Sequence, residues 1–130
     1  MLVHFPIGLV LIAAVAEVVS MTTGRGDWQT VAVANVRVGA VFAIGAAVAG
    51  WRLASSPGMD ATSSIDWHRW LGTIAAVAVF GAALATAGAD GRSRFGLWVY
   101  RSALFWAAAL VGVTGHLGGL LVWGADFLRP

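Results

Sequence analysis

The stretch WHRWLGTIAAVAVFGAALATAGA, residues 67–89, decides the fold class of this chain. After Arg69 it contains no charged residue, and a helix needs about 20 mostly apolar residues to cross a bilayer. Three other stretches have the same character, namely residues 3–22, 30–53 and 97–123. The sequence therefore predicts an all-α integral membrane protein, in which residues 1–130 form a single up-down bundle of four transmembrane helices.

The composition supports lipid as the solvent of this chain. Hydrophobic residues make up 59% of it and charged residues only 11%, whereas about a quarter of the residues of soluble domains are charged. The net charge of +2 is scattered, so we expect no nucleic-acid partner. The absence of Cys excludes thiolate metal sites and covalently attached c-type haem. Because the first apolar stretch has no basic leader or cleavage site, we expect a retained span.

The charges around the spans predict a topology. An even number of spans puts both termini and the Ala54–Asp66 connection on one side, side A, and the two short turns on side B. Side B has more arginines, Arg25, Arg37, Arg92, Arg94 and Arg101, than side A, which has Arg52, Arg69 and Arg129. Since positive residues stay inside, side B should be cytoplasmic and both termini periplasmic in a bacterial inner membrane.

Two further expectations concern helix ends and charges. Asp66, directly before the third span, is predicted to be its N-cap. Glu17 is the only acidic residue inside a span, and it lies at a depth similar to that of Arg37 on the next helix. Intramembrane charges usually pair, so we predict a Glu17–Arg37 ion pair that fixes packing.

The three histidines are predicted to share one level of the membrane. His4 and His68 open spans that begin at side A. His116 precedes Trp123, an interfacial residue, by seven positions or ~10 Å at the helical rise. If their helices turn these faces inward, that end of the bundle has a cavity lined with imidazoles. An intramembrane histidine indicates a functional site by default.

Small residues accompany each histidine. Gly112 and Gly119 share a helical stripe with His116, Gly8 follows His4 by one turn, and Gly72 follows His68 by one turn. Such glycines let membrane helices approach closely, and they also leave room for a flat macrocycle with an axial histidine. Arg52 and Arg69 at side A could neutralise haem propionates.

The occupants of such a site can be ranked from these residues. Haem b needs one or two histidines, and we expect His116 and His68 as axial ligands, with His4 as the close alternative. Copper or zinc bound by all three imidazoles is an alternative, as are histidines that bind no cofactor and hydrogen-bond to backbone or water. No catalytic constellation is evident, so we do not expect an enzyme.

The motifs His4-Phe5-Pro6, His68-Arg69-Trp70-Leu71-Gly72 and Gly115-His116-Leu117-Gly118-Gly119, together with Gly50-Trp51, resemble those of a bacterial family. It consists of small four-helix inner-membrane proteins with a domain of unknown function, and the resemblance covers the whole chain. Related domains are similar to modules found beside or fused to c-type cytochromes in some bacteria, so the resemblance implies redox work outside the cytoplasm. The resemblance draws attention to the same three histidines.

These observations lead to one functional expectation with alternatives. We expect a b-type cytochrome-like electron-transfer subunit of a larger respiratory or photosynthetic complex. Its partners would be the lipid bilayer, other membrane subunits, and a c-type cytochrome or a quinone. The alternatives are a structural transmembrane subunit without its own redox centre, or a histidine site for a transition metal.

Overall fold

The computed structural model describes residues 3–57, 62–89 and 93–124, so Arg92 and Arg129 lie outside the described residues. It contains four α-helices: α1 (His4–Thr23), α2 (Gly26–Ala54), α3 (Ser63–Ala89) and α4 (Arg94–Trp123). Each helix is long and apolar enough to span a membrane. The predicted all-α architecture with four membrane-crossing helices is confirmed.

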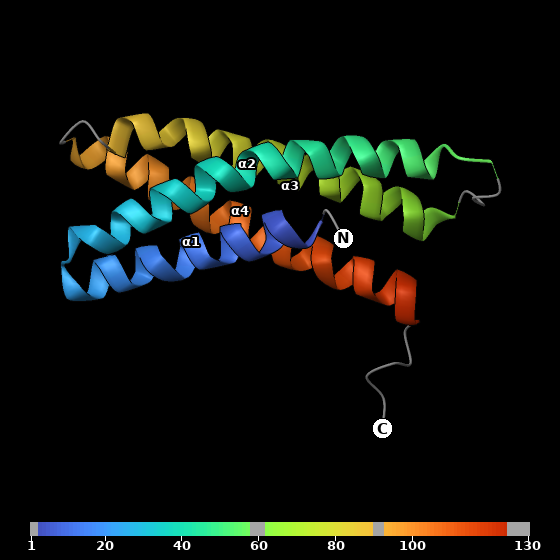
Figure 1. Cartoon of the computed structure of the whole chain (residues 1–130), viewed down its shortest axis with the longest axis horizontal. Coiled ribbons are helices and arrows are strands. Elements are labelled where there is room, and N and C mark those ends of the chain that lie inside the picture. The colour runs from blue at the N-terminus through green and yellow to red at the C-terminus, as the bar shows by residue number, and fades with distance from the viewer. Residues whose placement is uncertain (1–2, 58–61, 90–92, 125–130) are drawn as a thin grey trace, which may run out of the picture.

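The helices form an antiparallel ring. The end of α1, the start of α2, the end of α3 and the start of α4 lie at one end of the bundle, side B. The end of α2 and the start of α3 lie at the other end, side A (Figure 1). Helix α1 packs against α2, α2 against α3, α3 against α4, and α4 back against α1. Each helix therefore has one side facing the bundle axis and one side facing outward.

Helix α3 begins earlier than its hydropathy suggests, and this corrects the predicted N-cap. The helix starts at Ser63, and the Thr62 hydroxyl accepts a hydrogen bond of 3.4 Å from the Ile65 backbone N–H. Asp66 lies inside the first turn instead, where a carboxylate favours the helix dipole. There it accepts a 2.8 Å hydrogen bond from Arg69.

Small side chains fill most of the bundle core. Its buried apolar residues are mainly alanines, with a few larger groups such as Tyr100, Leu104 and Val79. Many large apolar side chains are exposed instead, including Trp106 at 71% and Val15 at 64%. Helix association in lipid gains no free energy from the hydrophobic effect, so close van der Waals packing at small residues must stabilise the bundle.

The tightest approach joins α3 and α4 near side B. A Cβ atom added to Gly96 would lie 2.8 Å from the carbonyl carbon of Gly88, and it would also collide with the Gly88 oxygen. Because the neighbour is backbone, it cannot rotate away as a flexible side chain could. The last turn of α3 and the first turn of α4 can therefore cross here only with glycine at position 96.

We predict that Gly96→Ala destabilises the bundle by about 1–3 kcal/mol, the usual cost of overpacking. The matched control is Gly112→Ala on the same helix, where an added Cβ has no atom within 4 Å. Unfolding in mixed detergent micelles measures both changes. Equal stability of the two variants would show that α3 and α4 do not cross at these glycines.

Candidate functional site

His68 faces the interior of the bundle. It lies on the α3 stripe that continues through Gly72, Ala75 and Val79, of which Ala75 and Val79 are buried. Its imidazole packs against α4, because a Cβ on Gly118 would lie 2.9 Å from the His68 Cε1 atom. The His68 Nδ1 atom is buried and has no hydrogen-bond partner among the described residues. The expected inward orientation thus holds for this histidine.

His116 and His4 point outward. Both are exposed, and they lie on the sides of α4 and α1 that are opposite to the buried residues of those helices. The stripe of His116 also contains Gly112 and Trp123, which are exposed as well. The three imidazoles therefore do not line a common cavity inside the bundle, since only α3 turns its histidine toward the bundle axis.

The arrangement separates the two expected axial ligands. His68 touches α4 at Gly118, whereas His116 lies two residues before it, a rotation of about 200° around the helix. The two imidazoles thus lie on nearly opposite sides of α4. Among the described residues, no group of three or more His, Asp or Glu side chains could hold a metal ion.

His116 and His4 nevertheless share a surface. A Cβ on Gly115 would lie 3.7 Å from the Ile7 Cδ1 atom, so this contact fixes how α4 faces α1. His4 precedes Ile7 by three residues and therefore lies ~4.5 Å nearer side A than this contact. His116 follows Gly115 by one residue on the antiparallel helix α4 and therefore lies ~1.5 Å nearer side A. The rotation per residue places both on the outer side of the α1–α4 pair, at similar depth.

The glycines beside the histidines differ in their roles. Gly72 packs in the α3–α4 seam, where an added Cβ would lie 3.6 Å from the Thr114 methyl group. In contrast, a Cβ on Gly8, Gly112 or Gly119 would meet no atom within 4 Å. The outer α1–α4 surface around His4 and His116 is therefore open, with room above the backbone.

The two side A arginines, expected near haem propionates, lie toward α2. Arg69 pairs with Asp66 at 2.8 Å, and its guanidinium lies 4.2 Å from the ring centre of Trp51. Trp51 also donates its indole N–H to Thr73 at 2.9 Å. Arg52 lies in the last turn of α2. Neither arginine belongs to the α1–α4 pair that carries the two exposed histidines.

A second polar centre lies deeper in the bundle, toward side B. The Glu17 side chain is fully buried, and its Oε1 accepts a 2.7 Å charge-assisted hydrogen bond from Arg101 Nε. This ion pair joins α1 to α4. A buried carboxylate is costly unless it is paired, so Arg101 makes the position of Glu17 tolerable.

The predicted ion pair between Glu17 and Arg37 is wrong. Arg37 donates its Nε to the Thr86 hydroxyl at 2.9 Å and so joins α2 to α3. An added Cβ on Gly39 would lie 3.3 Å from Val10, which puts Arg37 opposite about residue 12, ~7 Å from the level of Glu17. The prediction counted residues from the side A ends of the two helices. It did not find this difference in depth, because α1 and α2 do not begin and end at the same depth.

Tyr100 completes this centre, and no pattern in the sequence distinguishes it from the other apolar residues of its span. It is fully buried and close enough to Glu17, Arg37 and Arg101 to interact with their charges. Its hydroxyl and Glu17 Oε2 are both buried without a hydrogen bond to a described residue. A comparison of depths measured from side B would have identified Arg101 as the partner of Glu17. Arg101 lies ~10 Å from the start of α4 at Arg94, and Glu17 lies ~9 Å from the end of α1 at Thr23.

We predict an asymmetric effect of removing each charge of the ion pair. Arg101→Gln leaves a buried, unpaired carboxylate and should cost about 3–5 kcal/mol of unfolding free energy. Glu17→Gln should cost less, because Arg101 is partly exposed and can reach outward. The double variant should be milder than Arg101→Gln alone when unfolding is followed in mixed micelles.

Arg37→Gln is the matched control for this cycle. It should show little energetic coupling to Glu17→Gln, since Arg37 binds Thr86. Strong coupling of Glu17 with position 37 and none with position 101 would contradict the observed pairing.

Comparisons with known proteins agree with the membrane architecture. No curated protein and no solved structure matches the chain. A family model described as "Predicted membrane protein (DUF2231)" matches residues 1–127, which is nearly the whole chain. The chain therefore belongs to the DUF2231 family of membrane proteins.

Proposed function

We propose that this protein is an electron-transfer subunit of a larger membrane complex and contributes an axial histidine to a b-type haem. The observation that carries the proposal is the position of His116. Its imidazole is exposed on a membrane-spanning helix, ~10 Å inside the interfacial Trp123, and no hydrogen bond or ion pair of its side chain is found among the described residues.

The surroundings of His116 fit one face of a flat macrocycle. Gly112 and Gly119 lie one turn to each side of it, and an added Cβ at either would meet nothing within 4 Å. A porphyrin over this stripe would therefore meet backbone rather than bulky side chains. His4 on the adjacent helix lies at similar depth and would line the same surface.

The geometry also favours a ligand from a second chain. An iron in a six-coordinate site takes one imidazole on each face of the porphyrin. His68 lies across α4 from His116, and His4 approaches the shared surface from the same side as His116. The opposite ligand would then come from another membrane subunit, in keeping with a small chain that works inside a complex. When bound there, haem would carry one electron by cycling between ferric and ferrous iron.

We predict that the complex, purified from membranes in a mild detergent, shows the reduced-minus-oxidised absorption bands of a b-type haem. His116→Ala should abolish these bands while the bundle still inserts, because it removes an iron ligand. His68→Ala is the comparison variant, since His68 packs against Gly118 and should affect stability rather than the spectrum.

Two outcomes would overturn this assignment. Loss of the bands in His68→Ala with retention in His116→Ala would move the haem inside the bundle. A colourless complex without stoichiometric iron or other transition metal would favour the structural-subunit role.

We also propose that the protein resides in the bacterial inner membrane with side A periplasmic. The described arginines of the side B turns, Arg25 and Arg94, support this orientation. A reporter fused after Pro130 should be active only when the reporter functions in the periplasm. Activity of a cytoplasm-specific reporter at that position would reverse the orientation.

A further inference from the structure

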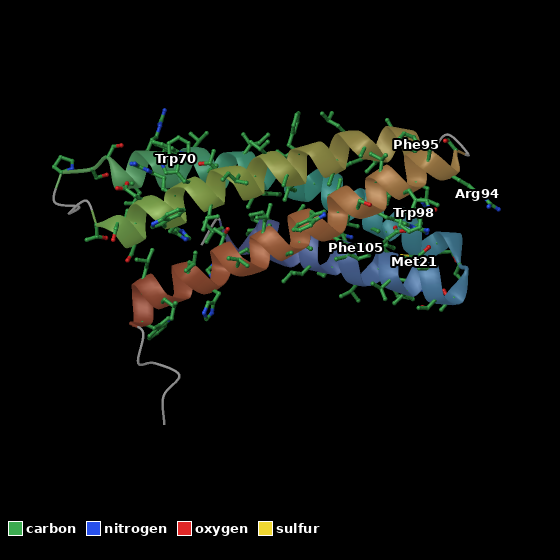
Figure 2. All side chains as sticks on the ribbon, turned by 180° about the vertical axis from the view of Figure 1, so that it is seen from behind. Met21, Trp70, Arg94, Phe95, Trp98 and Phe105 are labelled. Carbon is green, nitrogen blue, oxygen red and sulfur yellow. The ribbon has the colours of Figure 1, made fainter. Side chains whose placement is uncertain are left out.

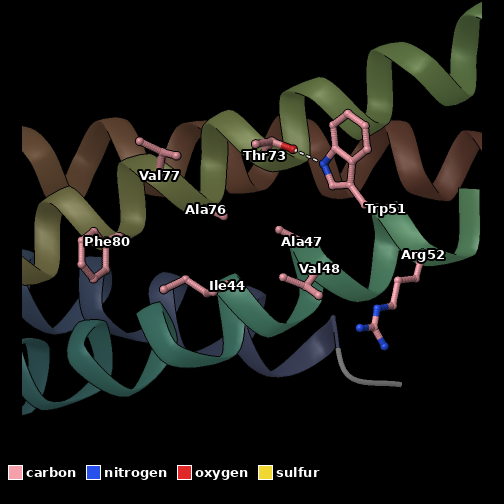
Figure 3. Close-up of a pocket in the computed structure, with 9 residues that line it drawn as sticks. All are labelled: Ile44, Ala47, Val48, Trp51, Arg52, Thr73, Ala76, Val77 and Phe80. Carbon is pink, nitrogen blue, oxygen red and sulfur yellow. Dashed lines mark hydrogen bonds between the residues drawn. The ribbon is translucent and has the colours of Figure 1, made fainter. Parts of the chain in front are cut away.

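A groove of about 520 Å³ runs along the outer side of α2 and α3 (Figure 3). Ala47 and Ala76 form its floor, and the larger apolar residues Val48, Val77 and Phe80 stand around it. The rim residues are exposed, Val48 at 52% and Val77 at 66%. In a bilayer this groove therefore opens toward lipid.

The groove is oriented along the membrane normal. On α2 its lining runs from Ile44 to Arg52, and on α3 from Phe80 back to Thr73. At 1.5 Å per residue the walls are ~10 to 12 Å long, from the interfacial level of Trp51 toward the middle of the bilayer. This shape matches an acyl chain that descends from a headgroup at side A.

Among the described residues, the positive charge at the mouth of the groove has no ion-pair partner. The Arg52 side chain leaves α2 at the Trp51 end of the groove (Figure 3). Its guanidinium makes no hydrogen bond or ion pair with any residue that the structure describes. Arg69, the other described arginine of side A, is neutralised by Asp66 and stacked on Trp51.

We propose that this groove binds an anionic phospholipid, with an acyl chain between α2 and α3 and the phosphate group paired with Arg52. The guanidinium offers several N–H donors in a planar fork that suits phosphate oxygens. The groove itself provides apolar contact for the chain. Phosphatidylcholine also has a phosphate, but its choline cancels the charge, so the site should prefer a lipid with net negative charge.

This surface lies opposite to the one that carries His116. Helices α1 and α4 form one side of the ring, and α2 and α3 form the other. The lipid site is thus independent of the proposed haem site, and failure of either proposal leaves the other untouched.

Native mass spectrometry of the purified protein in neutral detergent tests the site. The probes are phosphatidylglycerol and phosphatidylcholine with identical acyl chains, compared by apparent dissociation constant. Wild-type protein should bind phosphatidylglycerol more tightly. Arg52→Gln should weaken that binding about fivefold, the usual effect of one cation at an anionic headgroup, and leave phosphatidylcholine unchanged.

Matched controls separate the site from general effects. Arg94→Gln removes an exposed arginine at the opposite end of the bundle and should leave both dissociation constants unchanged. Val48→Phe narrows the groove and should weaken both lipids. Val41→Phe, two turns away on the same face and outside the groove, should weaken neither.

Three results would overturn the proposal. The two lipids could bind wild-type protein equally, or Arg94→Gln could weaken phosphatidylglycerol as much as Arg52→Gln. Alternatively, a ubiquinone could displace phosphatidylglycerol from the wild-type protein and fail to bind the Val48→Phe variant. The groove would then hold a neutral quinone.

Discussion

The close approach of helix backbones at small side chains is the constraint on which the rest of this structure depends. Apolar side chains gain little by leaving lipid for a protein core, so the helices associate through packing. The contact at Gly39 fixes how α2 faces α1, and the contacts at Gly96, Gly115 and Gly118 fix how α4 faces α3 and α1. Once these faces are set, the direction of every other side chain follows from the helical rotation.

The intramembrane charges depend on the same faces. Glu17 is fully buried, and Arg101 reaches it from α4, while Arg37 reaches Thr86 from α2 to α3. These two interactions cross different helix interfaces, and Tyr100 lies close to both arginines. Arg94, Phe95 and Trp98, which are labelled in Figure 2, lie at the same end of the bundle. A rotation of α4 by one residue would carry Arg101 away from Glu17 and leave a buried charge unpaired. The ion pair therefore opposes rotation that packing of small residues alone would tolerate.

The number and approximate limits of the helices could be predicted from the sequence, because hydropathy and length determine what can cross a bilayer. The inward faces could not. In a membrane both faces of a helix are apolar, so the stripe of His116, Gly112 and Gly119 looks like a packing seam but is largely open to the outside. The seam of α4 runs instead through Gly115 and Gly118, only one and two residues away.

Because His116 and His4 point outward, a cofactor site that includes them cannot be completed by this chain alone. A cavity lined by three imidazoles would be complete within one chain, whereas an outward histidine needs a surface opposite it. On the other side of the ring, the groove between α2 and α3 has an arginine at its mouth and an apolar floor, which suit a lipid. The two faces thus differ in chemistry: one presents imidazoles beside bare backbone, and the other presents a chain-shaped groove beneath a cation. If the proposed function holds, α1 and α4 form the face that docks into the complex, while α2 and α3 remain against the bilayer.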